Sequence, residues 1–140
     1  MKIILIFDNT AGSGGGFEQA LNILHLMSKI AKKNKFNYEI LSLNKNLNED
    51  LSFLNFNISY IKVNIFDKFF KFLLKVSNGI IVRRYLSFLN TFESKIIRKN
   101  PHLVFFINPT DLSLYLEKVN YISTVWDLGH RDFIEFPDLD

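Results

Sequence analysis

Short apolar runs alternate along the chain with longer segments in which apolar residues recur every three or four positions. The runs are the length of strands, and the first of them is apolar up to Phe7, which is typical of a strand buried on both faces. Five runs predict β-strands, at residues 2–7, 37–43, 58–63, 103–107 and 121–126.

Three segments have the period of an amphipathic helix. The first follows the glycine-rich residues 12–16 and carries an apolar stripe from Ala20 to Ala31. The second covers residues 66–76. The third, residues 81–99, predicts one long helix that Asn100-Pro101 ends.

Strands that alternate with helices predict an α/β fold: a Rossmann-like, mostly parallel sheet with helices on both faces. The 140 residues form a single domain in this prediction. A hydrophobic content of 48% supports a packed core, and the absence of cysteine excludes disulfides and thiolate metal sites. A net charge of +3 gives no argument for a nucleic-acid partner, and no apolar run is long enough to cross a bilayer. We expect a cytoplasmic location, because no signal-peptide pattern follows Met1.

The glycine loop Gly12-Ser13-Gly14-Gly15-Gly16 separates the first predicted strand from the first helix. In open α/β sheets ligands bind at the carboxyl ends of the strands, and the following helix offers free N–H groups to an anion. A phosphate or diphosphate is therefore the expected ligand. The Walker and dinucleotide patterns are both absent, because Phe17 stands where each requires another residue. The alternative is a turn that binds no ligand.

A second candidate site follows the fifth predicted strand, at residues 124–132. His130 titrates near neutral pH and can transfer a proton, while Arg131 can bind a phosphate or carboxylate through two hydrogen bonds. Asp127 could orient His130 or accept a hydrogen bond from a sugar hydroxyl. The alternative is a solvated surface loop with ordinary ion pairs. No metal site is expected, because the three histidines are scattered without a carboxylate cluster.

Residues 66–76 combine phenylalanines with lysines. Phe66, Phe69 and Phe70 share one predicted helix face, and lysines occupy another. Core packing beneath a lysine-covered outer face is the simpler interpretation. A helix lying on a membrane surface is the alternative, to which Arg83-Arg84 adds further positive charge.

Four stretches of the sequence form a recognisable set. The most specific of them begins at Thr124-Val125-Trp126-Asp127-Leu128-Gly129-His130-Arg131-Asp132 and runs on to Glu135-Phe136-Pro137. The others are Gly14-Gly15-Gly16-Phe17-Glu18-Gln19, Asn100-Pro101-His102-Leu103-Val104 and Asn108-Pro109-Thr110. Together they resemble the amino-terminal domain of GT-B glycosyltransferases, and more narrowly the retaining family four enzymes of bacterial polysaccharide and glycoconjugate synthesis. The resemblance spans nearly the whole chain.

The resemblance implies a site in a cleft between two Rossmann-like domains, one of which, the carboxy-terminal donor-binding domain, these residues lack. The expected partners are that second domain, a nucleotide-sugar donor, and a saccharide or lipid-linked acceptor, with peripheral membrane contact as a further expectation. No metal or other cofactor is implied. Little transferase activity is expected of this chain alone. The alternative is a non-catalytic Rossmann-like module that binds a nucleotide or phosphate, or docks a partner.

The resemblance also implies roles for individual residues. The donor phosphates would be bound by Gly14, Gly15 and Gly16. The catalytic candidates are Asp127 and His130, and the acceptor-binding candidates are Trp126, Arg131 and Asp132. The chain departs from the family at one position, because many members carry His-Asp where this sequence has Trp126-Asp127. In that family the histidine lies near the transferred sugar. Whether His130 takes over this role in the present chain is left open by the sequence.

Overall fold

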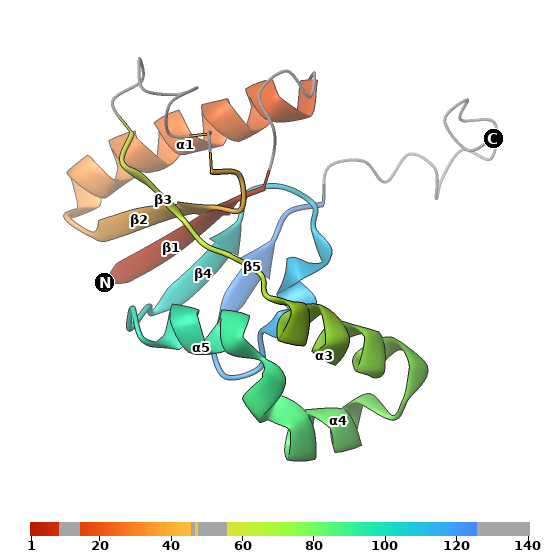
Figure 1. Ribbon diagram of the computed structural model, residues 1–140. Coiled ribbons are helices and arrows are strands. Elements are labelled where there is room, and N and C mark those ends of the chain that lie inside the picture. The colour runs from red at the N-terminus through yellow and green to blue at the C-terminus, as the bar shows by residue number, and fades with distance from the viewer. Residues whose placement is uncertain (9–14, 46, 48–55, 126–140) are drawn as a thin grey trace.

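The computed structural model describes residues 1–8, 15–45, 47 and 56–125. These residues form a five-stranded sheet in which every pairing is parallel, with the strand order β3-β2-β1-β4-β5 (Figure 1). The predicted α/β, Rossmann-like class is confirmed. The strands are β1 (Lys2–Phe7), β2 (Asn37–Ser42), β3 (Ile58–Tyr60), β4 (Leu103–Phe106) and β5 (Tyr121–Ser123).

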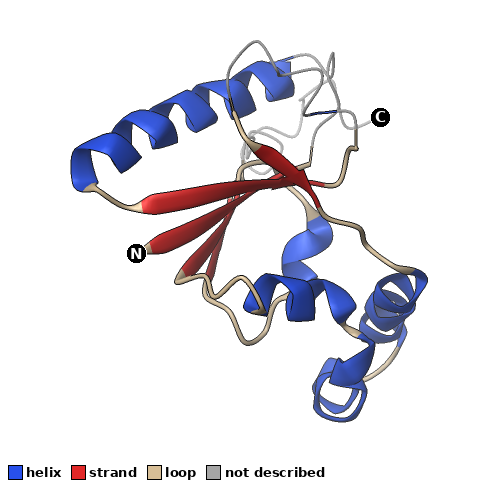
Figure 2. Cartoon of the chain, turned by 60° about the vertical axis from the view of Figure 1, so that its left-hand side comes forward, coloured by secondary structure: helices blue, strands red, loops and turns tan. Residues whose placement is uncertain are grey.

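Helices cover both faces of the sheet (Figures 1 and 2). One face is covered by the long helix α1 (Gly15–Asn34). The opposite face carries three helices and two short 3-10 turns: α3 (Ile65–Val76), α4 (Gly79–Leu86), η2 (Ser87–Leu89), α5 (Thr91–Ile97) and η3 (Asp111–Tyr115). None of the helices in the described ranges is both long and apolar enough to cross a bilayer.

Strand β1 is the centre of the core, because its side chains alternate between the two faces. Ile4 and Ile6 join the apolar cluster beneath α5, whereas Ile3, Leu5 and Phe7 join the cluster beneath α1. All five are buried, and each buried side chain of this size contributes about 1.5 to 3 kcal/mol. Burial on both faces explains why this run is apolar without interruption.

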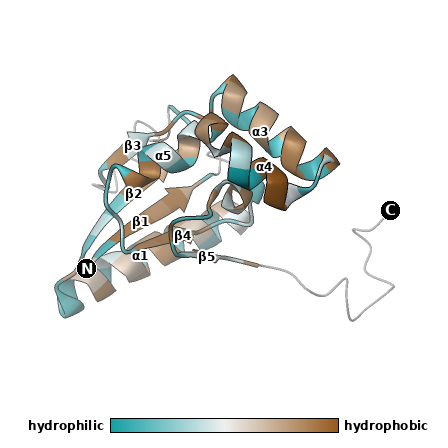
Figure 3. Ribbon diagram, turned by 90° about the horizontal axis from the view of Figure 1, so that it is seen from below, coloured by the Kyte–Doolittle hydropathy of each residue, from teal (hydrophilic) through white to brown (hydrophobic). Residues whose placement is uncertain are grey.

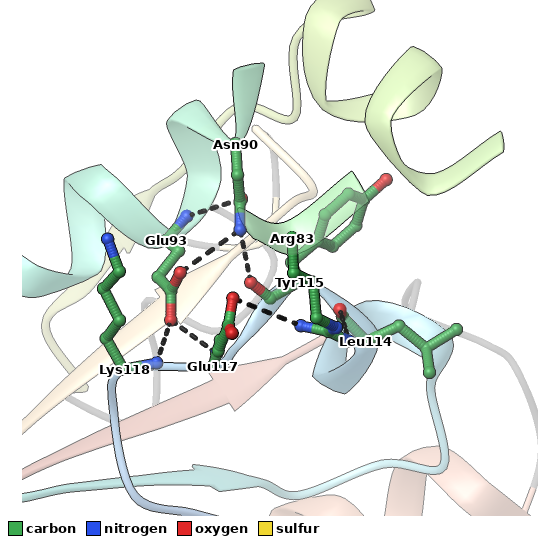
Figure 4. A network of polar contacts seen from close by, with 7 residues as sticks. All are labelled: Arg83, Asn90, Glu93, Leu114, Tyr115, Glu117 and Lys118. Atoms are coloured by element: carbon green, nitrogen blue, oxygen red, sulfur yellow. Dashed lines mark hydrogen bonds and ion pairs between the residues drawn. The ribbon is translucent and has the colours of Figure 1, made fainter. Parts of the chain in front are cut away.

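The prediction of one helix over residues 81–99 is wrong. Helix α4 ends at Leu86, and α5 begins at Thr91 after the η2 turn. Asn90 separates them, because its side-chain oxygen accepts a hydrogen bond from the backbone N–H of Glu93 at 3.2 Å and so caps α5. Its Nδ2 donates to the carbonyl of Tyr115 at 2.5 Å, which holds the cap against η3 (Figure 4).

Glu93 continues this buried network from the first turn of α5. Its carboxylate accepts hydrogen bonds from Asn90 Nδ2 at 3.3 Å and from the backbone N–H groups of Glu117 and Lys118 at 2.5 and 2.6 Å (Figure 4). The side chain is only 4% exposed, so its charge is offset by these donors. The network ties α5 to the segment that leads into β5.

The predicted packing of Phe66 and Phe69 in the core is also wrong. Both rings are more than half exposed, and Phe70 is the buried phenylalanine of α3. The reason is Asp67, which is fully buried and fixes the rotation of the helix. Its Oδ1 accepts a hydrogen bond from the backbone N–H of Phe92 at 2.8 Å. The side of α3 that carries Asp67 and Phe70 therefore faces the core.

Several element ends differ from the predictions. Strands β2 and β4 each end one residue earlier than expected, and α3 begins one residue earlier. Strands β3 and β5 are shorter than expected, ending at Tyr60 and Ser123. Helix α1 begins at Gly15, so the last two glycines of the predicted loop are helical. The first strand has the predicted bounds.

Candidate functional site

The strand order places a topological switch between β1 and β4. The chain continues from β1 to β2 and β3 on one side, and β4 and β5 lie on the other. In open parallel sheets, ligands bind at the carboxyl ends of the two strands on either side of such a switch. Ile6 is paired with Phe106, and Asp8 and Asn108 each lie two residues beyond this pair. We call the carboxyl ends of β1 and β4 the switch edge.

Helix α1 begins at the switch edge. The ring of Phe17, in its first turn, lies edge-on against the ring of Phe7 at the end of β1, with centroids 5.8 Å apart. The first N–H groups of a helix have no partner within the helix and carry its positive end. The start of this 20-residue helix is therefore a suitable position for an anion.

Gly15 is the first residue of α1, and it is exposed. Among the described residues, no atom lies within 4 Å of the position that a Cβ would occupy there. The packing of the helix therefore does not explain a glycine at this position.

Asp8 and Asn108 are joined directly across the switch edge. The backbone N–H of Asp8 donates to Asn108 Oδ1 at 3.3 Å, and Thr110 Oγ1 donates to Asp8 Oδ2 at 3.2 Å. Asn108 is 2% exposed, and its Nδ2 has no hydrogen-bond partner within the described part of the chain. A buried donor without a partner costs free energy, so a ligand oxygen that accepted from it would gain that energy back.

Burial raises the pKa of the Asp8 carboxyl, opposed by the hydrogen bond from Thr110 and assisted by the negative charge of Asp111. A carboxyl group with a raised pKa at a ligand-binding edge is a common feature of functional sites. Asp8 offers oxygen acceptors and Asn108 offers a donor. The switch edge can therefore bind hydroxyl groups beside an anion at the start of α1.

Replacing Asp8 with asparagine is expected to leave the melting temperature at pH 7 unchanged or higher. Burial disfavours the charged carboxylate in the folded state, so removing that charge removes a cost that is fully present above the raised pKa. The advantage of the variant should shrink as the pH falls through the raised pKa and should disappear below 3.8, the usual pKa, where Asp8 is mostly protonated in both the folded and the unfolded chain. Thermal melts at a series of pH values measure this, and a lower melting temperature at pH 7 would contradict it.

Most of the residues predicted for the site lie outside the described residues. These are Gly14, Trp126, Asp127, His130, Arg131 and Asp132. Gly15 and Gly16 are the first two residues of α1 at the switch edge. Thr124 is hydrogen-bonded to the carbonyl of Phe106, through its backbone N–H at 3.2 Å and its hydroxyl at 2.8 Å. The chain therefore passes the carboxyl end of β4 just before Trp126.

The two described histidines lie away from the switch edge. His25 is exposed on α1 and its ring lies tilted against that of Phe56, with centroids 5.3 Å apart. His102 Nδ1 accepts a hydrogen bond from the backbone N–H of Lys2 at 3.1 Å, at the amino end of the sheet. A hollow of about 350 Å³ also lies at that end, lined by His102 and Lys118 among others. Within the described ranges, no group of three or more histidine, aspartate or glutamate side chains could hold a metal ion.

Sequence reasoning did not select Asp8, Asn108 or Thr110 as site residues. Asn108-Pro109-Thr110 was one of the four stretches that resemble GT-B glycosyltransferases, without a role for its side chains. The available signal was their position, because each follows an apolar strand of a predicted parallel sheet. Polar residues at the ends of adjacent parallel strands lie side by side.

Comparison of the chain with protein-family models, with curated proteins and with solved structures finds no match in any of the three. The fold is therefore established by the strand pairing alone, and the switch edge is a candidate site. The resemblance to glycosyltransferases stays a prediction.

Proposed function

We propose that this chain is the amino-terminal, acceptor-side domain of a glycosyltransferase that uses a nucleotide-sugar donor. The observation that carries the proposal is the arrangement at the switch edge. There, the start of α1 with Gly15, the Asp8 carboxyl and the Asn108 amide lie together, and Asn108 Nδ2 has no hydrogen-bond partner among the described residues. A ligand with both phosphate and hydroxyl groups matches this set of donors and acceptors.

Each part of the ligand has a matching group in the proposal. The first N–H groups of α1, at Gly15 and Gly16, face the donor diphosphate. Asp8 accepts a hydrogen bond from a sugar hydroxyl, and Asn108 Nδ2 donates to a sugar or phosphate oxygen. Asp127 and His130 are proposed for catalysis, and Trp126, Arg131 and Asp132 for acceptor binding. These five follow Thr124, which is anchored at the same edge.

The proposal is tested by isothermal titration of the chain with hexoses carried on uridine, guanosine and thymidine diphosphates. We expect at least one nucleotide sugar to bind more tightly than its free hexose, since both parts of the ligand are recognised. Millimolar affinity corresponds to about −4 kcal/mol and would suffice for half of a two-domain site. If no nucleotide or nucleotide sugar binds at millimolar concentration, the proposal is wrong and the partner-docking alternative is favoured.

Two variants separate a transferase site from a plain phosphate site. If the site is that of a transferase, Asn108→Ala and His130→Ala should both weaken binding of the nucleotide sugar. If it is a plain phosphate site, the nucleoside diphosphate should bind as tightly as the nucleotide sugar, and His130→Ala should have no effect. The second result would favour a non-catalytic nucleotide- or phosphate-binding module.

A further inference from the structure

The helical layer formed by residues 65–88 has an unusually apolar outer surface. Nine of the seventeen large apolar side chains that are exposed in the described ranges belong to these residues, with exposed fractions from 52% to 78%. Figure 3 shows the apolar colouring of α3 and α4 at the end of the molecule that projects from the sheet. A contiguous apolar surface of this kind marks an interaction site in most soluble domains.

Helix α3 exposes one continuous apolar arc. At 3.6 residues per turn, the side chains opposite the buried Asp67 fall side by side, and they are exposed. Lysines border one edge of this arc, with Lys68 and Lys75 both exposed. The apolar side chains of the arc are Ile65, Phe66, Phe69, Phe72 and Val76.

Helix α4 and the η2 turn extend the same surface. Ile81, Tyr85 and Phe88 follow at helical spacing and are exposed, and Ile80 lies beside them. Phe88 and Phe66 line a common hollow of about 270 Å³, so the exposed faces of α3 and η2 meet there. We call the exposed apolar side chains of residues 65–88 the apolar face.

Every charged side chain within residues 65–88 is basic except Asp67, which is fully buried. Two of these basic side chains have an acidic partner outside the segment. Lys71 pairs with Asp111, and Arg83 pairs with Glu117 at 3.9 Å. Lys68, Lys75 and Arg84 remain exposed, with no ion-pair partner among the described residues.

We infer that the apolar face binds the surface of a membrane that contains anionic phospholipids. Phenylalanine and isoleucine side chains enter the boundary between headgroups and acyl chains, while Lys68, Lys75 and Arg84 contact lipid phosphates. Charge complementarity selects this partner, because a second copy of the face would bring the same positive charges together. Helices α3 and α4 lie along the surface and do not cross it.

Flotation of the 140-residue chain with lipid vesicles tests the inference. Phosphatidylcholine vesicles that contain phosphatidylglycerol should carry the chain upward, and pure phosphatidylcholine vesicles should not. Each basic residue near an anionic surface strengthens binding roughly fivefold. Changing Lys68, Lys75 and Arg84 together to glutamate should therefore weaken binding by roughly a hundredfold or more. Equal flotation with both lipid compositions would overturn the inference.

The chain offers a matched charge control on α1, which lies on the other side of the sheet. Lys29, Lys32 and Lys33 are also exposed lysines of a helix. Changing these three to glutamate changes the net charge by the same amount and should have much less effect on flotation. Equal loss in both triple variants would show that net charge alone attracts the chain, which would overturn the inference.

A second pair of variants tests the apolar contact itself. Phe69→Ser combined with Phe72→Ser should abolish flotation, whereas Leu26→Ser, at an exposed leucine of α1, should retain it. All three side chains are exposed, so folding should be unaffected, and circular dichroism checks this. Full flotation of the double variant would overturn the inference. So would a lipid-free dimer in sedimentation equilibrium that the double variant dissociates, because the face would then bind a second copy.

Discussion

Replacing Asp67 with alanine is expected to lower the free energy of unfolding by about 3 to 5 kcal/mol. Asp67 is fully buried and caps two helices at once. Its Oδ2 accepts from the backbone N–H of Asn64 at 2.7 Å, before α3, and its Oδ1 accepts from that of Phe92 at 2.8 Å, in α5. The hydroxyl of Thr91 lies 3.0 Å from both oxygens. Alanine would leave these donors buried without a partner.

The size of the effect follows from the number of donors that lose their acceptor. Single domains are stable by about 5 to 15 kcal/mol, so this one change removes a large part of the total. Asp67→Asn should lower the free energy of unfolding by less, because the amide keeps one acceptor oxygen. Some loss should remain, because the amide NH₂ group then faces a donor. Urea unfolding followed by circular dichroism measures both variants.

The matched control is Asp111, an exposed acid that pairs with Lys71. An exposed ion pair contributes about 0 to 1 kcal/mol, so Asp111→Ala should change little. If Asp67→Ala cost no more than Asp111→Ala, the description of Asp67 as the residue that fixes α3 against α5 would be wrong.

Replacing Gly15 with valine is expected to weaken nucleotide-sugar binding at least tenfold while leaving the fold intact. Open space surrounds the position of a Cβ at Gly15 among the described residues, so a larger side chain has room in the free protein. That side chain would occupy the space in front of the first N–H groups of α1, where the proposal places the diphosphate. A tenfold loss of affinity corresponds to about 1.4 kcal/mol. One hydrogen bond to a charged group contributes up to about 3 kcal/mol, so losing a single bond to the diphosphate would be enough.

Gly79 provides the control for this change, because it is the first residue of α4 as Gly15 is of α1. A Cβ there meets only Leu74 Cδ2, at 3.8 Å. Gly79→Val should therefore leave binding unchanged, since α4 lies on the opposite face of the sheet from α1. Calorimetric titration of both variants, with a thermal melt of each, measures the difference. Equal affinity of the Gly15 variant and the unchanged chain would remove α1 from the site.

The sheet was predictable because a strand buried on both faces appears in the sequence as an uninterrupted apolar run. Strand β1 had the predicted bounds, and the stripe of α1 matched its packed side from Ala20 to Ala31. Pattern alone could not locate the break at Asn90, because the Tyr115 carbonyl that holds its side chain lies 25 residues further along. The same holds for the rotation of α3, which depends on hydrogen bonds to residues 91 and 92.

The candidate site was predicted only in part. Gly15 and Gly16 of the glycine loop begin α1 at the switch edge, and a phosphate ligand there stays a prediction. The contact between Asp8 and Asn108 joins residues 100 positions apart, and only the strand order brings them together. Neither residue type is distinctive by itself, so no local motif marked them.

The central claim is that a nucleotide sugar binds at the switch edge, and amide-resolved nuclear magnetic resonance tests it most directly. The chain labelled with nitrogen-15 is titrated with the nucleotide sugar that binds most tightly. The account predicts that the amide signals of Asp8, Gly15, Gly16 and Phe17 shift, together with the side-chain amide of Asn108. Shifts confined to other parts of the chain, such as the hollow beside His102, would contradict it.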